Sequence, residues 1–424
     1  MARLLYSLGI YLLLPFAFLH LLWRARRQPE YLRHWAERLG VYGERRTSTA
    51  PVIWIHAVSV GETRAAEPLV ALLRARYPHH AIVFSHTTPT GRATSLEIFG
   101  DKVDRLYLPY DTPDAVRRFL QRWQPVLGII METEIWPNLV AACCRTRVPL
   151  LLVNARLSLR SAQRYALLPA LTRPALAGFG RVVAQGPEDA RRLENLGAQR
   201  VTVSGNLKFD LTPAEEMVER GRRWREAWQG GAADGGRSVL LAASTRDGEE
   251  LLLFEALRRN PIANLLLVLV PRHPQRFEAV AALGAAMGHK LQRRSAGETL
   301  APDTTLFLGD SMGELYAYYA ASDLAFIGGS LLSYGSQNLI EACAVGVPVL
   351  IGPSTYNFAW AAGAALACGA ARQVGDADQL VAVAGSLLQD KAARAGMGEA
   401  GLRFSAQHRG ASARTLALIE EYLG

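Results

Sequence analysis

Short, uninterrupted apolar runs alternate with helical patterns along most of this 424-residue chain, and this alternation restricts its fold more than any other feature. Within each run the apolar residues are continuous, which is typical of strands buried on both faces of a parallel sheet. A first series covers residues 51–56, 81–86, 126–131, 149–154, 181–185 and 200–205. This series predicts one α/β domain.

A second series of runs follows the glycine-rich segment GGAADGG. These runs cover residues 238–244, 264–270, 304–309, 323–329 and 347–353. A chain of this length, half of it apolar, is too long for one core and suits two domains of ordinary size. The sequence therefore predicts an α/β protein with two Rossmann-like, doubly wound domains, divided between Asn206 and Gly236. Two such domains would face a cleft, where the carboxyl ends of their strands place the ligand site.

The N-terminal segment from Leu4 to Trp23 carries no charge and is long enough to cross a bilayer. Residues 24–46 follow with seven arginines and three glutamates, a net charge of +4. The sequence LLWRARRQ offers no small-residue cleavage site, so we expect an uncleaved anchor rather than a signal peptide. The positive flank places the rest of the chain in the cytoplasm and would attract anionic lipid. A buried core helix is the alternative.

Composition argues against several classes of function. The net charge is +9, and arginine supplies nearly all of the positive charge. The arginines are scattered over many predicted helices rather than interleaved with aromatic residues on one face, which argues against nucleic-acid binding. The cysteines have no metal-ligand spacing, and Cys143 and Cys144 are adjacent. We therefore expect no metal site, no disulfide framework and a reducing compartment.

The first corner between an apolar run and a helical pattern reads WIHAVSVGETR. Ser59 and Glu62 have the spacing of a capping box, in which the glutamate reaches back to the start of the helix. Gly61 lets a ligand approach the backbone closely, and the corner follows a strand end, where an open sheet places its active site. Glu62 is therefore either a helix cap or a general base that accepts a proton from an attacking hydroxyl.

Two further corners of the first domain carry charged residues. In GIIMETEIWPNL, Glu132 and Glu134 follow a strand, and Pro137 suits a first helical turn. Helix N-termini attract carboxylates, but two acids at a second strand end also indicate an acidic patch facing the ligand. The spacing does not choose between the two glutamates. In SGNLKFD, Lys208 is a compact cation suited to a point contact with an anion, or else a solvated loop lysine.

The second domain has features of a nucleotide binder without the usual fingerprints. It has no G-x-G-x-x-G after its first strand and no P-loop, which argues against a dinucleotide cofactor and against an NTPase. The sequence VPRHP places Arg272 and His273 just after a strand, in reach of a phosphate or base. In GDSMGELYAYYAASD, Ser311 and Glu314 have capping-box spacing with Gly313 in the first turn, which predicts an anion site at a helix start.

The stretch GGSLLSYGSQNLIEACAVGVPVLIG is the most informative part of the second domain. Its glycine-rich loop leads into a predicted helix on which Asn338 and Glu341, three residues apart, share one face. A carboxylate there could grip a pair of ribose hydroxyls. A plain amphipathic helix ended by Gly346 is the alternative.

Six motifs carry a resemblance that spans nearly the whole chain: HAVSVGE, METEIWPN, GNLKFD, PRHPQRF, GDSMGELYAYYAASD and GVPVLIGPSTYNF. In these motifs and in its N-terminal anchor the chain resembles the Kdo transferase family, which attaches 3-deoxy-D-manno-octulosonic acid (Kdo) to a lipid A precursor in Gram-negative bacteria. The resemblance implies a GT-B glycosyltransferase fold, inversion at the anomeric carbon, and no metal or other cofactor. It also implies CMP-Kdo as donor, the lipid A precursor as acceptor and an inner-membrane location.

The resemblance also assigns roles to individual residues. It implies that Glu62 is the proton acceptor and that Glu132 and Lys208 stabilise the transition state. It implies contacts with the CMP-sugar from a set in the second domain: Pro271, Arg272, Met312, Gly313, Glu314, Asn338, Leu339, Ile340 and Glu341. Arg246 and Gln337 stand where the family usually has histidines, which leaves the fine geometry of the donor site open.

We expect four segments along the chain. These are an anchor at 1–24, an acceptor-binding domain at 25–210, a CMP-sugar-binding domain at 211–400, and a C-terminal helix at 401–424 that packs back on the first domain. Two other functions stay open at this point. One is a different membrane-associated GT-B glycosyltransferase with another nucleotide sugar, and the other is a non-catalytic nucleotide- or lipid-binding protein.

Overall fold

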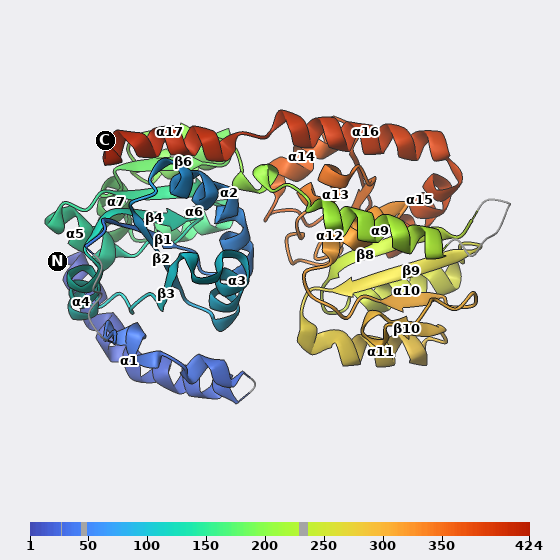
Figure 1. Ribbon diagram of the computed structural model, residues 1–424, viewed down its shortest axis with the longest axis horizontal. Coiled ribbons are helices and arrows are strands. Elements are labelled where there is room, and N and C mark those ends of the chain that lie inside the picture. The colour runs from blue at the N-terminus through green and yellow to red at the C-terminus, as the bar shows by residue number, and fades with distance from the viewer. Residues whose placement is uncertain (27, 44–48, 229–235) are drawn as a thin grey trace. The chain divides into compact units, whose positions relative to one another are not determined.

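The computed structural model of the chain describes residues 1–26, 28–43, 49–228 and 236–424. It contains two compact units (Figure 1). Unit 1 comprises Met1–Leu211 with Arg409–Gly424, and unit 2 comprises Thr212–His408. Arg27, Glu44, Arg45 and Arg46 of the basic flank, and all of the GGAADGG segment except its last glycine, lie outside the described residues.

Unit 1 is built on a parallel sheet of seven strands in the order β3-β2-β1-β4-β5-β6-β7. The strands are β1 (Val52–His56), β2 (Ala81–His86), β3 (Asp104–Tyr107), β4 (Pro125–Met131), β5 (Leu150–Ala155), β6 (Arg181–Ala184) and β7 (Val201–Val203). The helices between them are α2 (Val60–Arg76), α3 (Pro89–Phe99), α4 (Pro113–Trp123), α5 (Pro137–Thr146), α6 (Leu159–Ala166), α7 (Pro169–Ala177) and α8 (Pro187–Asn195). The six strands predicted for the first domain are all present, and the edge strand β3 is an addition to the prediction.

The core of unit 1 has two halves, one on each face of the sheet. Trp54 packs in one half and its neighbours Ile53 and Ile55 in the other, and all three side chains are fully buried. This arrangement explains why the central strands are apolar at every position. The C-terminal helix α17 (Ala411–Leu423) packs against α2 and closes the second half of the core.

Unit 2 repeats the plan with a parallel sheet in the order β10-β11-β9-β8-β12-β13-β14. Its strands are β8 (Ser238–Thr245), β9 (Leu265–Pro271), β10 (Leu291–Arg293), β11 (Leu306–Leu308), β12 (Leu324–Ile327), β13 (Val349–Ile351) and β14 (Ala371–Gln373). Its helices are α9 (Glu215–Trp228), α10 (Glu249–Arg259), α11 (Phe277–Ala286), α12 (Leu315–Ala320), α13 (Ile340–Val345), α14 (Ala359–Ala367), α15 (Ala377–Gln389) and α16 (Lys391–Gln407). The five predicted strands are present, and the edge strands β10 and β14 are additions.

The expected single helix at 401–424 is wrong, because the chain forms two helices there. α16 ends at Gln407 in unit 2, and α17 begins at Ala411 in unit 1. Gly410 has a φ of 90°, in the left-handed region, and it immediately precedes α17. This break lets the last 16 residues belong to a different unit from α16.

Each sheet has a central point at which its strand order reverses, and ligands of open α/β sheets bind at the carboxyl ends of the strands there. In unit 1 the reversal falls between β1 and β4, and in unit 2 it falls between β8 and β12. The loop with Glu62 follows β1, and Glu132 follows β4 directly. The topology therefore places two residues from separate sequence motifs at one point of the sheet.

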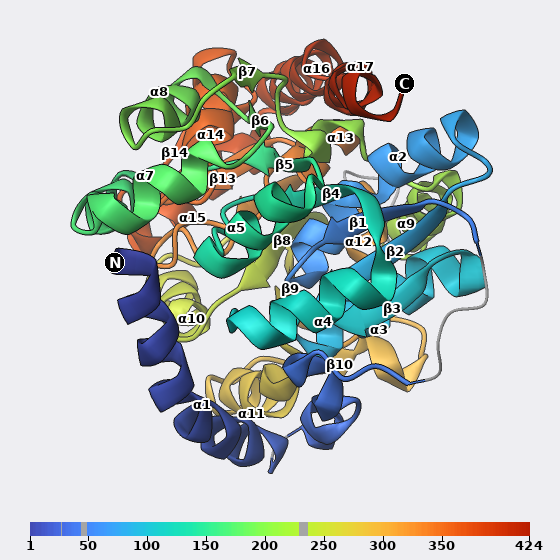
Figure 2. The same cartoon turned by 90° about the vertical axis from the view of Figure 1, so that its left-hand side faces the viewer.

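The N-terminal helix α1 (Ala2–Ala25) lies on the outside of unit 1 (Figures 1 and 2). Within the described residues it is the one helix long and apolar enough to cross a membrane. Only 11% of its most apolar window is buried, so the alternative of a buried core helix is wrong.

Candidate active site

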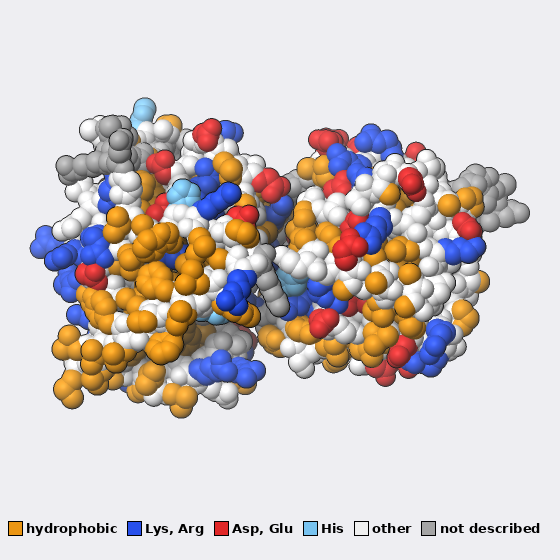
Figure 3. Space-filling view, turned by 90° about the horizontal axis from the view of Figure 1, so that it is seen from below, with side chains coloured by type: hydrophobic (Ala, Val, Ile, Leu, Met, Phe, Trp, Pro, Cys, Tyr) orange, Lys and Arg blue, Asp and Glu red, His pale blue; other side chains and the backbone are white. Residues whose placement is uncertain are grey.

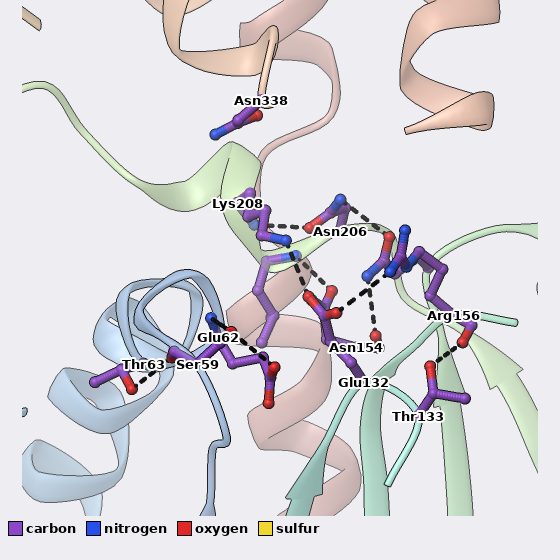
Figure 4. A network of polar contacts seen from close by, with 12 residues as sticks. Ser59, Glu62, Thr63, Glu132, Thr133, Asn154, Arg156, Asn206, Lys208 and Asn338 are labelled. Atoms are coloured by element: carbon purple, nitrogen blue, oxygen red, sulfur yellow. Dashed lines mark hydrogen bonds and ion pairs between the residues drawn. The ribbon is translucent and has the colours of Figure 1, made fainter. Parts of the chain in front are cut away.

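The corner after β1 forms the predicted capping box. Ser59 is the N-cap of α2, and its hydroxyl oxygen accepts from the Glu62 backbone N–H at 3.3 Å. In return, the Glu62 carboxylate accepts from the Ser59 hydroxyl and from the Val58 backbone N–H, each at 2.8 Å (Figure 4). Each carboxylate oxygen keeps a second lone pair, so capping leaves Glu62 able to accept a proton.

The loop that carries this cap is fixed from behind by two residues that the sequence analysis missed. The His86 ring Nδ1 lies 2.8 Å from the Ala57 carbonyl oxygen, and the Thr88 hydroxyl donates to the Val58 carbonyl at 2.9 Å. His86 is fully buried, and burial lowers its pKa to about 4, so it is neutral and donates from Nδ1. These bonds hold the loop whose Val58 N–H contacts Glu62.

Glu132 follows β4 and is the charged centre of the site. Its Oε1 lies 2.9 Å from the Lys208 ammonium, its Oε2 lies 3.8 Å from Arg156, and the Glu132 and Lys208 side chains are each only 14% exposed. The backbone of Glu132 has a φ of 58°, a left-handed conformation that is uncommon for a residue with a side chain and concentrates at functional sites. Among the described residues Glu134 makes no ion pair with Lys208, so the structure distinguishes the two glutamates.

A chain of buried amides positions Lys208. The Asn206 side chain accepts from the Lys208 backbone N–H at 3.0 Å and donates to Gln185 at 3.0 Å. Asn154, at the end of β5, accepts from the Leu207 N–H at 3.1 Å and has a φ of 55°. The sequence contained one signal for this network, because Asn154 interrupts an apolar run, but the partners come from three separate segments.

The two glutamates differ in their affinity for a proton. Burial, followed by the negative charge of Glu132, raises the pKa of Glu62 to about 8. Burial acts in the same direction on Glu132, but the Lys208 ammonium and then the Arg156 guanidinium outweigh it, so the pKa of Glu132 lies below its ordinary value. The site therefore combines a carboxylate of raised pKa with one of lowered pKa, a pairing suited to proton transfer.

In unit 2, positively charged side chains gather after β8 and β9, beside the reversal of the sheet. Arg272 Nε donates to the Gln337 side chain at 3.2 Å, and the Arg246 guanidinium lies over the Tyr334 ring at 4.6 Å. Burial, and then the charges of nearby arginines, lower the pKa of His273. This cluster is suited to an anion, as the sequence predicted for Arg272.

A buried carboxylate on α10, also missed by the sequence analysis, shapes the glycine-rich loop next to this cluster. Glu249 is 1% exposed, and its carboxylate accepts from three backbone N–H groups. These are Arg246 at 2.8 Å, Gly329 at 2.6 Å and Leu331 at 3.0 Å. Glu249 thus fixes the start of the loop to the end of β8.

The predicted capping box at Ser311 and Glu314 is wrong. The helix α12 begins only at Leu315, and the Ser311 hydroxyl lies 2.9 Å from the Tyr318 hydroxyl. The Glu314 carboxylate is bound by Arg220 at 2.8 Å and by Arg294 at 3.0 Å. The Ser311 hydroxyl thus contacts buried Tyr318 rather than the start of a helix, and the Glu314 carboxylate binds these two arginines.

Three other residues were predicted to contact the CMP-sugar: Met312, Gly313 and Pro271. Met312 is 58% exposed, and Gly313 has a φ of 81°, which favours glycine. Pro271 ends β9 and is buried. The Met312 side chain is therefore open to a ligand, whereas buried Pro271 is not.

Asn338 and Glu341 contact each other, as predicted, but not on one helix. The helix α13 begins at Ile340, so Asn338 lies in the preceding loop, and its side chain donates to Glu341 at 3.0 Å. The Asn338 side chain also accepts from the Ile340 N–H at 3.1 Å. Leu339 and Ile340 are buried, so they can offer a ligand only their backbone.

Among the described residues no group of three or more His, Cys, Asp or Glu side chains could hold a metal ion. The four cysteines are free thiols, of which Cys143 and Cys343 are buried.

Comparisons with known proteins show the family of the chain. Residues 33–211 match the family model of 3-deoxy-D-manno-octulosonic-acid transferase. The chain is 44% identical to the 3-deoxy-D-manno-octulosonic acid transferase of Bordetella pertussis over 100% of both chains. It is 38% identical to the enzyme of the same name from Haemophilus influenzae, over 94% of this chain and 93% of that one.

A solved glycosyltransferase from Rickettsia africae matches 89% of this chain and 99% of its own with a TM-score of 0.60 and 14% identity. At that identity the likeness shows the fold alone. Together with the two parallel sheets, it confirms the predicted GT-B architecture.

Proposed function

The chain belongs to the Kdo transferase family, and from that premise we propose that it moves Kdo from CMP-Kdo to a lipid A precursor, with Glu62 as general base. As a member of this family it is a glycosyltransferase of lipopolysaccharide biosynthesis. The observation that carries the proposal is the raised pKa of Glu62 beside the ionised Glu132–Lys208 pair.

The proposed step balances as a displacement with inversion. The acceptor's sugar hydroxyl gives its proton to Glu62, and its oxygen forms a bond to the anomeric carbon of Kdo. The bond from that carbon to the phosphate oxygen breaks, and its electron pair leaves with CMP. A base with a pKa near the working pH suits this transfer, because it is basic enough to take the proton and still available in the ionised form.

Lys208 and Glu132 are proposed to act together in the transition state. Their ion pair is mostly buried and is positioned by the Asn206 side chain, which accepts from the Lys208 backbone N–H. Preorganised charges of this kind stabilise a transition state more than mobile ones, because they need no reorganisation during the reaction.

Unit 2 is proposed to hold the CMP-sugar. Arg272, next to the loop that Glu249 fixes, supplies positive charge, which suits a departing phosphate. Asn338 and Glu341 supply a polar pair for the nucleoside. The contacts that the family resemblance assigns to Pro271, Met312, Gly313 and Glu314 remain proposals, with Glu314 acting through its hold on Arg220 and Arg294.

The experiment that tests the function is incubation of the full-length protein with a tetraacylated lipid A precursor and CMP-Kdo generated in situ, followed by mass spectrometry of the lipid. We expect the lipid to gain the mass of one or more Kdo units, also in the presence of EDTA. A lipid of unchanged mass would contradict the proposal.

Thermal melting with nucleotides separates the alternatives. We expect CMP to raise the melting temperature and UDP to leave it unchanged. Protection by UDP instead would favour another GT-B glycosyltransferase, and protection by CMP without transfer would favour a nucleotide-binding protein that lacks catalysis.

A further inference from the structure

Burial along α1 follows the period of an α-helix from one end to the other. The buried and half-buried positions of its docked face recur at spacings of three and four: Ser7, Ile10, Leu14, Ala17, Phe18, Leu21 and Ala25. Such a stripe arises where one face of a helix packs on a surface. The helix therefore lies against unit 1 along its whole length.

Side-chain contacts hold both halves of α1 to unit 1. In the N-terminal half the Tyr6 hydroxyl donates to Asp111 at 3.0 Å, and the Ser7 hydroxyl contacts the Asn138 side chain. In the C-terminal half the Phe18 ring packs edge-on against Trp35 and Tyr110, with centroids 6.0 and 5.8 Å away. A helix held at both ends by one domain cannot also cross a bilayer unless that domain enters the lipid.

Asp111 connects the docked helix α1 to the start of α5 in the interior of unit 1. Its carboxylate is 2% exposed and accepts from the backbone N–H groups of Asn138 at 2.9 Å and Leu139 at 2.8 Å, at the start of α5. The Tyr6 hydroxyl completes the set of donors around it. Three donors from two segments, α1 and the start of α5, thus meet at one buried carboxylate.

The outward face of α1 is apolar and exposed over most of its length. Its exposed large side chains are Leu4, Leu5, Leu8, Leu12, Leu13, Phe16, Leu19, Leu22 and Trp23. Exposed Leu32 and Trp35 follow it in the chain, and Figure 3 shows hydrophobic side chains gathered over this face of unit 1. A patch of this extent on a soluble surface marks a contact with membrane or protein.

We propose that α1 lies in the plane of an anionic membrane surface, with this outward face in the lipid, and does not span the bilayer. Lipid is favoured as the occupant because exposed arginines lie at both ends of the helix and just after it, at Arg3, Arg24, Arg26 and Arg33. Trp23 and Trp35, close to Arg24 and Arg33 in the chain, are also exposed, and such aromatic rings prefer the headgroup level.

This orientation has a consequence that rests on the proposed function. Asp111 and Asn138 follow β3 and β4, so α1 docks at the carboxyl edge of the sheet that also carries Glu62 and Glu132. The membrane surface is then adjacent to the edge from which the acceptor hydroxyl must approach. A lipid-linked acceptor would reach Glu62 without leaving the bilayer.

Depth measurement by spin labelling tests the orientation without measuring transfer. In the full chain with Cys144→Ser and Cys368→Ser, single cysteines at Leu5, Leu12 and Leu19 carry nitroxides. These positions share one face and lie about 10 Å apart along the helix. The probe is vesicles of phosphatidylethanolamine with phosphatidylglycerol, and a label at exposed Leu402 of unit 2 is the water reference.

We expect equal, shallow depths at all three positions, from accessibility to oxygen and to a water-soluble nickel chelate. A spanning helix would instead place Leu12 deepest, with Leu5 and Leu19 near opposite surfaces, and would overturn the proposal. Labels that contact neither lipid nor water would show a second copy on this face, which also overturns it. Failure here leaves the transfer assay unaffected, so the two proposals can fail separately.

Discussion

The Lys208 ammonium lies 2.9 Å from Glu132 Oε1 although 76 positions separate the two residues in the chain. Lys208 lies in the short 3₁₀ helix Leu207–Asp210, and Glu132 follows β4 in a left-handed conformation. The fold thus brings together two motifs that spacing alone could not pair. The negative charge of Glu132 in this pair is, after burial, the second cause of the raised pKa of Glu62.

A double-mutant cycle measures this pair. We expect Glu132→Gln to lower the free energy of unfolding by about 3 kcal/mol, because it leaves Lys208 largely buried without its partner. Lys208→Met should cost less, since Arg156 remains 3.8 Å from Glu132. The double variant should lose less than the sum, as urea denaturation will show. Additive losses would contradict a direct interaction.

Replacing Glu62 separates its two roles. A capping box accepts glutamine as well as glutamate, so Glu62→Gln should keep the helix start while removing the proton acceptor. We expect transfer to fall by about 10²- to 10⁴-fold, with CMP binding retained and with no loss of melting temperature at pH 5.

Two matched variants complete that comparison. Ser59→Ala removes the cap but leaves the carboxylate, so we expect a loss of about 1 kcal/mol in stability and a smaller loss of transfer than in Glu62→Gln. Glu62→Ala should lose both. Full transfer by Glu62→Gln would reduce Glu62 to a helix cap.

The pattern of apolar runs was enough to predict the interior of both sheets and the edge strand β7, but it missed the other three edge strands. Central strands such as β1 are buried on both faces and therefore read as apolar at every position. The missed strands β3, β10 and β14 are edge strands with polar sequences such as Asp104–Tyr107. They have solvent on one side, so no continuous apolar run marks them.

The site shows a similar limit. Glu62, Glu132 and Lys208 were found because strand ends and short motifs mark them locally. The partners of these residues were missed, because His86 and Gln185 contact the site only through the tertiary fold. The error at Ser311 has the same origin, since its hydroxyl contacts Tyr318 instead of a helix N-terminus.

The pH dependence of transfer follows from the two carboxylates. Because burial and Glu132 raise the pKa of Glu62 to about 8, we expect kcat/KM to increase with pH through about 8 as Glu62 loses its proton. Glu132→Gln removes a negative charge that helps to raise the pKa of Glu62, so the residual kcat/KM of this variant should increase at a lower pH than that of the parent. An increase at the same pH would show that Glu132 does not act on Glu62.

Stability should change with pH in the opposite sense. The folded-state pKa of Glu62 lies above its ordinary value of 4.5, so the folded protein holds a proton that the unfolded chain releases. The contribution of Glu62 is therefore present below pH 4.5 and lost as pH rises through about 8. We expect Glu62→Gln to melt higher than the parent at pH 8.5 but not at pH 5.

Glu249 tests the importance of the loop in unit 2. Its carboxylate accepts three backbone N–H groups, and Glu249→Gln would turn one acceptor into a donor that faces an N–H. We expect a loss of about 1–3 kcal/mol in stability and weaker CMP binding by calorimetry. Glu255→Gln on the same helix is the control, with a change below about 0.5 kcal/mol because Glu255 is only half-buried and makes a long ion pair. Equal effects would exclude a loop-specific role.

Arg246 offers a test of which arginine binds the sugar carboxylate of the donor and which binds its phosphate. Its guanidinium is half-buried and lies over the Tyr334 ring, and within the described residues it makes no ion pair with a carboxylate. Arg272, by contrast, is bonded to Gln337 and is proposed to contact CMP. We therefore expect Arg246 to bind the carboxylate of the donor sugar and Arg272 the phosphate. Arg246→Ala should raise the KM for CMP-Kdo about 10- to 100-fold, the value of a charge-assisted hydrogen bond, while the affinity for CMP alone changes little.

The neighbouring tyrosine supplies the control for Arg246. Tyr334→Phe keeps the ring under the guanidinium and loses only a bond to the Asp247 carbonyl, so it should transfer Kdo at the parental rate. Tyr334→Ala removes the ring and should raise the KM for the donor a few-fold, since a cation–π contact at an exposed site contributes about 0.5–1 kcal/mol. If Arg246→Ala instead weakened CMP and CMP-Kdo equally, the guanidinium would contact the phosphate. The sugar carboxylate would then need another cation, for which Lys208 is the remaining candidate among the proposed site residues.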